Sequence, residues 1–359
     1  MQDEALLAFF PKLTPKRYQD LARIPASFDE IWQANAQSLK QTGWDEELIR
    51  EFISWREALN VEKIERDLQK EGIEVIAQSD ERYPSLLKQL YDPPAALFVR
   101  GTLAKVDLCL AIVGTRKCTP YGRQVVEELV PQLVESGLTI VSGLALGIDG
   151  FAHEATLRAG GKTIAVLGSG VDRAHVFPTT HSDLANRIIA SGGAVISEYP
   201  PGMMANTFTF PRRNRIVAGM SLGTLVTEAP EGSGALITAQ CALDNNREVF
   251  AVPQNITHEN AFGPNTLIKN GAHPVSTVED ILSVLHIEKA KAQTVARATL
   301  PDSPEEAALL PFLTREPIHI DFIAKQAKLP SHLVSGILTL MEMKGRVRNV
   351  GGMKYVIPM

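Results

Sequence analysis

Residues 108–122 read Leu-Cys-Leu-Ala-Ile-Val-Gly-Thr-Arg-Lys-Cys-Thr-Pro-Tyr-Gly, and this stretch decides the fold class. The apolar and β-branched run that ends at Val113 predicts a buried strand, and Gly114 marks the turn after it. Proline is tolerated in the first turn of a helix, so we expect a helix to begin near Pro120. The stretch is therefore a strand, a tight turn and a helix, which together open a βαβ unit.

The same alternation of strand, glycine-bearing turn and helix continues to about residue 285. Short apolar runs predict six strands, at residues 108–113, 138–141, 163–167, 193–196, 224–227 and 249–252. Such alternation gives βαβ units and a mainly parallel sheet with helices on both faces. We therefore predict a protein of the α/β class whose main domain, residues 106–285, has a Rossmann-like sheet.

Four further segments complete the organisation of the chain. Residues 1–70 have helical periodicity and predict a small helical module of the SAM or helix-hairpin-helix type. Prolines in residues 71–105 predict an extended connector that packs on the main domain. Residues 286–303 have the composition of a linker. Residues 304–359 show three helical patterns and then two short strands around Gly351-Gly352, which predicts a winged helix.

The composition indicates a globular protein of the reducing cytoplasm. The chain has 359 residues and a formal net charge of -5, with 45% hydrophobic and 21% charged residues, as in soluble proteins of two or three domains. Cys109, Cys118 and Cys241 are odd in number and lack metal-ligand spacing, so we expect neither disulfides nor a zinc site. No stretch resembles a signal peptide or a membrane span. An acidic chain of this kind binds nucleic acid only through a local positive cluster.

Glycine-rich turns follow several of the predicted strands at one edge of the sheet. Gly114, Thr115 and Arg116 form the first, where helix-start N–H groups and the arginine suit an anion, although a solvated Arg-Lys pair in a tight turn explains it equally well. Gly143 and Gly168 lie in two similar turns, and Ser233-Gly234 begins another helix. Together these turns indicate a groove for a phosphate-bearing ligand.

The strongest binding signal is the run Phe-Thr-Phe-Pro-Arg-Arg-Asn-Arg at residues 208–215. Arg212, Arg213 and Arg215 form a local positive cluster, and Phe210 beside them is placed to stack on a base. Phosphate neutralisation and aromatic stacking together allow sequence-tolerant binding of single strands. The alternative is an exposed helix start with a buried Phe210, in which one arginine pairs with an internal carboxylate such as Glu228.

Catalytic and metal-binding constellations are not evident in the sequence. Asp149 and His153 share a helix face, but no third ligand has suitable spacing, so we expect a capping aspartate and a packed histidine. There is no paired acid and base and no nucleophile elbow. We therefore expect no enzyme activity, no catalytic residue, no metal and no cofactor.

In their order and number, these motifs resemble the DNA-processing protein A (DprA/Smf) family over about residues 80–280. The matching stretches include Gly114-Thr115-Arg116 with Tyr121-Gly122, Ser142-Gly143-Leu144-Ala145, Gly160–Gly170, Phe210–Ile216 and Ser233-Gly234-Ala235. The resemblance implies a protein that binds and protects single-stranded DNA entering during natural transformation and loads the RecA recombinase onto it. It also implies a homodimer formed through the Rossmann-like domain.

The resemblance assigns roles to individual residues. It makes Arg116 and Lys162 phosphate contacts and Phe210 a stacking residue. The full set expected at the single-strand site is Gly114, Thr115, Arg116, Tyr121, Gly143, Lys162, Gly168, Phe210, Arg212, Arg213, Asn214, Arg215, Ser233 and Gly234.

Two alternatives stay open. A nucleotide-processing hydrolase of the lysine-decarboxylase-like (LOG) group would also have glycine loops, but its Pro-Gly-Gly-x-Gly-Thr-x-x-Glu signature is met only at Gly223-Thr224, with Glu228 displaced by one residue. The winged helix has little positive charge on its predicted recognition helix, residues 331–344, so we expect a protein-contact or accessory role. Arg346 and Arg348 on the wing leave a weak DNA contact possible.

Overall fold

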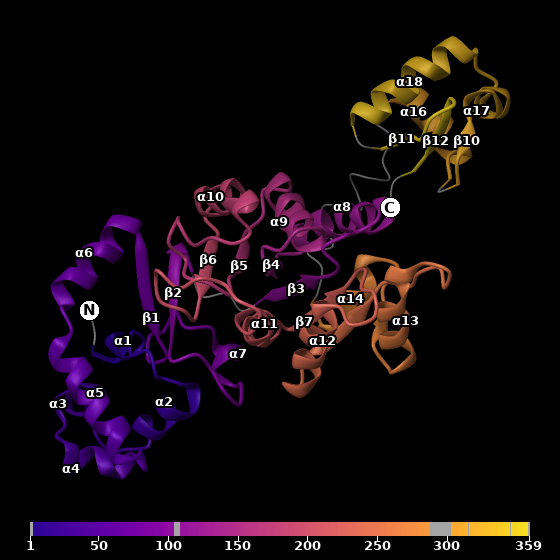
Figure 1. The fold of residues 1–359 in the computed structure, drawn as a ribbon. Helices are drawn as coiled ribbons and strands as arrows, with labels where there is room; N and C mark the ends of the chain where they lie inside the picture. Colours follow the sequence, from indigo (N-terminus) through magenta and orange to yellow (C-terminus); the bar gives the residue numbers. More distant parts are fainter. Residues whose placement is uncertain (1–2, 104–107, 288–302, 315, 345, 358–359) are drawn as a thin grey trace. The chain divides into compact units, whose positions relative to one another are not determined.

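The computed structural model describes residues 3–103, 108–287, 303–314, 316–344 and 346–357. It divides the chain into two compact units, Met1–Ile287 and Glu288–Met359 (Figure 1). Most of the predicted linker at 286–303 lies outside the described residues. Each unit is described by itself below.

The first unit is built on a nine-stranded sheet with the order β1-β2-β6-β5-β4-β3-β7-β8-β9. Its strands are β1 (Ile73–Ala77), β2 (Ala96–Gly101), β3 (Cys109–Val113), β4 (Thr139–Ser142), β5 (Thr163–Val166), β6 (Ala194–Ser197), β7 (Gly223–Val226), β8 (Glu248–Ala251) and β9 (His273–Pro274). Strands β3 to β9 are parallel, and the six predicted strands are β3 to β8. Their near-continuous apolar runs suit strands that are buried on both faces. The predicted α/β class with a mainly parallel Rossmann-like sheet is thus confirmed.

Residues 71–105, predicted as a connector, also contribute two strands to the sheet. Strand β1 pairs antiparallel with β2, and β2 pairs antiparallel with β6, so this segment extends the sheet by two strands. Every residue of β2 from Ala96 to Arg100 is buried. Pro93 and Pro94 lie just before β2, outside the paired residues, where their missing N–H groups leave no gap in the ladder.

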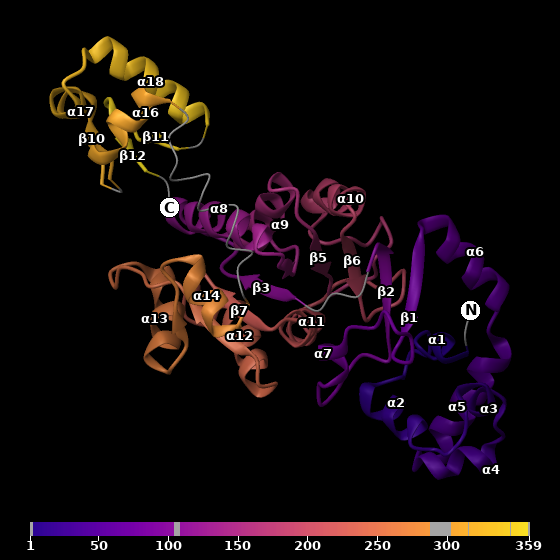
Figure 2. The same ribbon diagram turned by 180° about the vertical axis from the view of Figure 1, so that it is seen from behind.

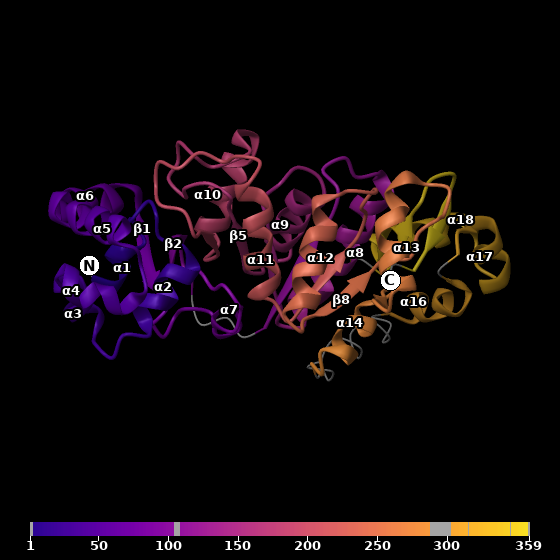
Figure 3. The same cartoon turned by 60° about the horizontal axis from the view of Figure 1, so that its bottom comes forward.

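Helices cover both faces of the sheet (Figures 1 and 2). On one face pack α8 (Pro120–Glu135), α9 (Ile148–Arg158), α10 (Ser182–Ala190) and α14 (Val278–Val284). On the other face pack α7 (Ser85–Lys88), α11 (Thr209–Gly219) and α12 (Gly234–Asp244). Figure 3 shows α11 and α12 in front. Helix α13 (Phe262–Lys269) packs beside β8. As predicted, α8 begins at Pro120, and the Thr119 hydroxyl caps it by accepting from Gly122 N at 3.3 Å.

The N-terminal helices form an aromatic core of their own. They are α1 (Asp3–Leu7), α2 (Pro15–Ala22), α3 (Phe28–Gln33), α4 (Ala36–Leu39) and α5 (Glu46–Ala58), whereas α6 (Val61–Glu71) packs through Leu68 on the core beside the sheet. Phe52, which is fully buried, contacts the rings of Phe10, Trp32 and Trp44. Phe9 packs edge-to-face on Phe98 of β2 at 5.1 Å, which attaches these helices to the sheet.

The second unit has the predicted winged-helix architecture. Its helices are α16 (Pro304–Leu309), α17 (Ile320–Ala327) and α18 (Ser331–Met343), and its strands are β10 (Ile318–His319), β11 (Arg348–Asn349) and β12 (Lys354–Val356). The strands form an antiparallel sheet with the order β10-β12-β11. Strand β10 adds a third strand to the two that the sequence predicts for the wing.

Candidate nucleic-acid interface

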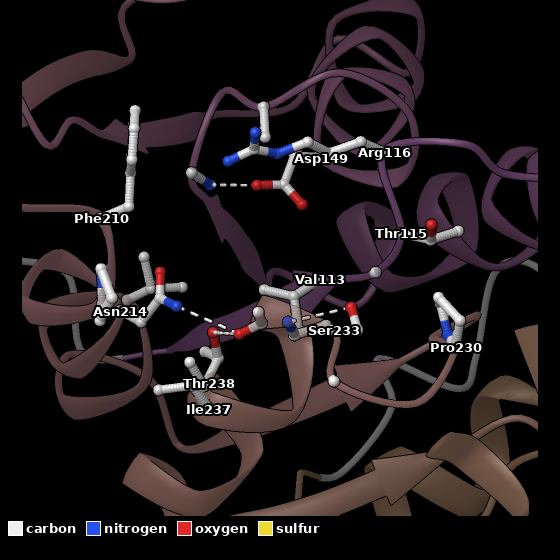
Figure 4. A pocket seen from close by; sticks show the side chains of 18 of the residues that line it. Val113, Thr115, Arg116, Asp149, Phe210, Asn214, Pro230, Ser233, Ile237 and Thr238 are labelled. Atoms are coloured by element: carbon white, nitrogen blue, oxygen red, sulfur yellow. Dashed lines mark hydrogen bonds between the residues drawn. The ribbon is translucent and has the colours of Figure 1, made fainter. Parts of the chain in front are cut away.

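A pocket of about 390 Å³ opens at the carboxyl ends of the parallel strands. Strand β3 leads to β4 on one side, and β7 pairs with it on the other, so the pocket lies where the strand order reverses, a usual ligand site in such sheets. It is lined by residues that follow β3, β4 and β7 and by residues of α11 and α12 (Figure 4). Nine residues of the predicted set line it, namely Gly114, Thr115, Arg116, Gly143, Phe210, Arg213, Asn214, Ser233 and Gly234.

The turn after β3 presents two free cations. Thr115 N donates to Glu228 O at 2.7 Å and Thr115 O accepts from Ile148 N at 3.3 Å, so the backbone of the turn is fixed. Gly147 makes this close approach possible, since a Cβ on it would lie 2.3 Å from Thr115 O. Arg116 and Lys117 are exposed, and neither side chain makes a hydrogen bond or ion pair within the part of the chain that the structure describes. Both are therefore available to an anion.

Phe210 lies between the pocket and the loop after β5. The guanidinium carbon of Arg116 is 5.5 Å from the centroid of its ring, and the ring of Phe177 is 5.6 Å away. A Cβ on Gly168 would come within 3.2 Å of Phe210 Cδ1, so the glycine leaves space for the ring. Phe210 is half-buried, and Figure 4 shows its ring standing at the pocket beside Arg116. Stacking by Phe210 stays a prediction.

Two of the three clustered arginines are buried and already paired. Arg213 is 5% exposed, and its guanidinium donates to Gly143 O at 2.6 Å and to Val166 O. Arg215 is 8% exposed and pairs with Glu198 at 2.5 Å and with Asp92 at 3.2 Å. Only Arg212 is exposed. The expected positive cluster is therefore weaker than the sequence indicates, because the helical turn of α11 points two of its arginines inward.

The carboxylate that the sequence suggested as an arginine partner has another role. Glu228 is 1% exposed and accepts from Thr119 N at 2.8 Å, from the Thr119 hydroxyl and from Asn260. It thus holds the start of α8. The suggestion that Glu228 neutralises an arginine is wrong, and Glu198 and Asp92 do so instead.

Five predicted residues lie outside the pocket lining: Tyr121, Lys162, Gly168, Arg212 and Arg215. Lys162 precedes β5, so it lies at the amino ends of the parallel strands, whereas the pocket is at their carboxyl ends. The structure thus places Lys162 outside this pocket, whereas the resemblance makes it a phosphate contact. Tyr121 lies on α8, and its hydroxyl donates to Pro253 O at 3.2 Å.

The start of α12 forms the opposite wall of the pocket. Ser233 caps the helix by accepting from Ala235 N at 3.3 Å, and Asn214 Nδ2 donates to Gly234 O at 3.1 Å. Figure 4 shows Ser233, Ile237 and Thr238 on this side. A helix N-terminus aimed at a cavity favours an anion, although the exposed carboxylate of Glu231 also lines the pocket. Lys117, Ile237 and Thr238 also line the pocket but are absent from the predicted set. Of these three, only Lys117 was indicated by the sequence, because it follows Arg116 in the first turn.

His153 is packed as we expected, whereas Asp149 is not the expected helix cap, because α9 has Gly147 at its N-cap position and no side-chain cap. Asp149 is 5% exposed and accepts from Gly143 N at 3.0 Å, which closes the turn after β4. His153 is fully buried with Nδ1 at 2.7 Å from the Thr163 hydroxyl. Within the ranges that the structure describes, no group of three or more His, Cys, Asp and Glu side chains is arranged to hold a metal ion. In the same ranges, no helix has the length and apolar character needed to cross a membrane.

Fold and site together define a Rossmann-like α/β protein with a cation- and aromatic-lined pocket at its sheet edge and a separate winged-helix unit. The family model described as DNA recombination-mediator protein A matches residues 74–286, and the DprA winged helix domain matches residues 293–353. The chain belongs to this DprA/Smf family.

Similarity extends over nearly the whole chain. Protein Smf of Escherichia coli is 36% identical over 348 residues, which is 93% of this chain and 90% of that protein. DNA processing protein DprA of Bacillus subtilis is 44% identical over 218 residues, covering 60% of this chain and 72% of that one.

Two solved structures of DNA processing protein A also match. That of Streptococcus pneumoniae has a TM-score of 0.67 and 33% identity and covers 79% of this chain and 98% of that one. That of Helicobacter pylori has a TM-score of 0.52 and 28% identity, covers 60% and 95%, and is described as showing a single-stranded DNA binding mode.

Proposed function

We propose that the pocket binds single-stranded DNA, and that the protein protects an incoming strand and loads the RecA recombinase onto it during transformation or recombination. The observation that carries this proposal is the free cation Arg116 beside the half-exposed ring of Phe210. A cation for phosphate and an aromatic face for a base suit a strand of any sequence. The single-stranded DNA binding described for the Helicobacter pylori relative supports the same function.

We infer that the winged helix contacts protein rather than duplex DNA. On α18, Leu333, Leu340 and Met343 are 42%, 56% and 81% exposed. Arg346 on the wing pairs with the buried Glu306, so part of its charge is neutralised. A duplex-reading helix needs phosphate partners, and α18 contains neither lysine nor arginine.

We also propose a homodimer formed through the Rossmann-like unit. Ile256 and Phe262, at the edge of the sheet next to β8 and α13, are 88% and 45% exposed. Apolar side chains in such positions suit an isologous contact between two copies.

We infer that the protein acts by binding and not by catalysis. A hydrolase of the lysine-decarboxylase-like group would need a free carboxylate near Gly223-Thr224, whereas Glu228 is buried and bound to Thr119 and Asn260. His153, the histidine nearest to the pocket turns in sequence, is fully buried.

A pair of matched variants tests the proposed site. Arg116→Ala should weaken binding of an oligothymidylate by about 1.5–3 kcal/mol, the value of a hydrogen bond to a charged group. Lys162→Ala removes the same charge from an exposed position at the opposite edge of the sheet and should have little effect. Binding titrations on both folded variants provide the measurement. Equal losses for the two variants, or no loss for Arg116→Ala, would contradict the assignment of the pocket.

A further inference from the structure

Phe177 is a second aromatic side chain, which contacts Phe210 from outside the residues that line the pocket and has no role in the proposed function. It lies in the loop that leads from β5 to the short 3-10 helix at Thr179–His181. Its ring centroid is 5.6 Å from that of Phe210, with the two planes tilted by 47°. The residue is 45% exposed, so a large part of the ring faces solvent.

The spacing around Phe210 determines where a base is able to stack. Carbon atoms in contact are about 3.5–4.0 Å apart, so a base held between two planar groups separates them by roughly 7 Å. The ring of Phe177 at 5.6 Å and the guanidinium carbon of Arg116 at 5.5 Å are both closer to Phe210 than that. A base therefore cannot enter either gap. It reaches the outer face of Phe177 directly, and the face of Phe210 once Arg116 has moved aside.

The loop that carries Phe177 is fixed in the free protein. The Asp172 carboxylate accepts from Gly202 N at 2.9 Å and is paired with His175 Nδ1. Gly170 N donates to Met203 O at 2.8 Å. These contacts join the loop to the segment that leads into α11, where Phe210 lies. The two rings are thus held together before a ligand arrives, which lowers the entropy lost on binding.

We infer that Phe177 is a second base-stacking position, so that Phe177 and Phe210 take two bases of the same single strand while Arg116 turns from the Phe210 ring to a phosphate. This inference rests on the proposed function and adds a subsite to it. A Phe at this position provides a π face without a polar group, so it accepts any base.

The test uses the full chain and two probes of equal length, an oligothymidylate and an abasic oligomer that has only the sugar–phosphate backbone. Phe177→Leu keeps an apolar side chain but removes the π face. It should lower affinity for the oligothymidylate about five-fold or more, the effect of losing one base–aromatic stack, and leave affinity for the abasic oligomer unchanged. Phe177→Tyr should bind like the wild type. Phe322→Leu, at an aromatic residue of the second unit that is 53% exposed, is the control and should have no effect.

A double-variant cycle separates stacking from positioning. If both rings stack, the fold-loss of affinity in the Phe177→Leu, Phe210→Leu double variant should equal the product of the fold-losses in the two single variants. A double variant that binds like Phe210→Leu alone would mean that Phe177 only holds Phe210 in place, and it would overturn the inference. Unchanged oligothymidylate binding by a folded Phe177→Leu would overturn it as well. Failure of the proposed function is a different result, namely that the wild-type chain does not bind the oligothymidylate at all.

A fluorescence variant gives a second readout that does not depend on the stability of Phe177→Leu. Phe177→Trp places an indole at the subsite, and a stacked base should quench its emission when the oligothymidylate is added, but not when the abasic oligomer is added. The wild-type chain has three tryptophans, Trp32, Trp44 and Trp55, all in the N-terminal part of the chain, and its signal gives the background. An indole that is not quenched at saturating oligothymidylate would contradict the inference.

Discussion

Burial decides what each arginine near the pocket is able to do. Arg116 is exposed and free, whereas Arg213 is 5% exposed and binds the carbonyl oxygens of Gly143 and Val166. Burial lowers the pKa of the Arg213 guanidinium, and the neighbouring Asp149 carboxylate opposes that shift. The side chain joins the ends of β4 and β5 to α11, so its first role is to shape the pocket wall.

Replacing Arg213 should therefore reduce stability before it reduces binding. Arg213→Leu leaves two buried carbonyl groups without their donor and removes the positive charge near the buried Asp149, and we expect the free energy of unfolding to fall by about 3–5 kcal/mol. Thermal unfolding is the measurement. Arg212→Leu, at the exposed neighbour in the same helix, is the control and should change stability by no more than about 0.5 kcal/mol. If Arg213→Leu melts like the wild type but loses DNA affinity, Arg213 is a direct contact and the structural assignment is incorrect.

At the level of elements, His153 joins helix α9 to strand β5. The Thr163 hydroxyl donates to Ile140 O at 2.7 Å, so it accepts from His153 Nδ1–H. The buried Nε2 has no hydrogen-bond partner among the residues that the structure describes. A proton on Nε2 would be a buried charge without a partner. Burial, with smaller effects of His181 and Arg213, lowers the pKa of His153 from 6.5 to about 3.

This depressed pKa predicts a loss of stability in acid. Between pH 6.5 and about 3 the unfolded chain binds a proton at His153 and the folded chain does not, so stability is complete above 6.5 and falls as the pH falls through this window. The contribution has a limiting slope of about 1.4 kcal/mol per pH unit. In His153→Asn the amide reaches the position of Nδ1 but does not titrate. The free energy of unfolding of this variant should therefore depend less steeply on pH, by about 1.4 kcal/mol per pH unit. Unfolding titrations across the window provide the comparison, and equal slopes for the two proteins would disprove the assignment.

The elements of the sheet were predictable where the sequence pattern is local. The runs before Gly114, Gly143 and Gly168 are continuous and apolar, and each is a strand that ends at the pocket edge. Strands β1 and β2 were missed as members of the sheet because they join it through the pairing of β2 with β6, a strand far away in the chain. Alternating apolar and polar residues within a proline-rich segment do not indicate which strand the segment pairs with.

The site was predicted only in part, because the sequence reveals local motifs but not contacts between distant segments. Phe210 and Arg116 were singled out as neighbours in function, and the structure brings them together. The sequence does not reveal that Arg213 and Arg215 point inward, because the carboxylate partners of Arg215 come from other elements. Lys162 belongs to a motif of the family but lies at the amino end of β5, opposite to the pocket. Its distance from the pocket becomes visible only when the direction of the strands is known.

For the whole molecule, all residues that line the pocket belong to the first compact unit. A chain shortened to residues 1–287 should therefore keep most of its affinity for an oligothymidylate. Circular dichroism establishes that the shortened chain is folded, and a binding titration compares it with the full chain. Loss of most of the affinity would mean that the winged helix carries the DNA contact.

The preference of the protein for single-stranded over double-stranded DNA tests most directly the claim that the pocket binds a single strand. The affinity of the full chain for an oligonucleotide and for its duplex of equal length should be measured over a series of salt concentrations. We expect tighter binding of the single strand, because stacking on Phe210 needs an unpaired base. Affinity should fall with salt at a logarithmic slope of about -1 to -2, as expected for a few phosphate contacts on a single strand. Equal affinity for the two forms would contradict the account.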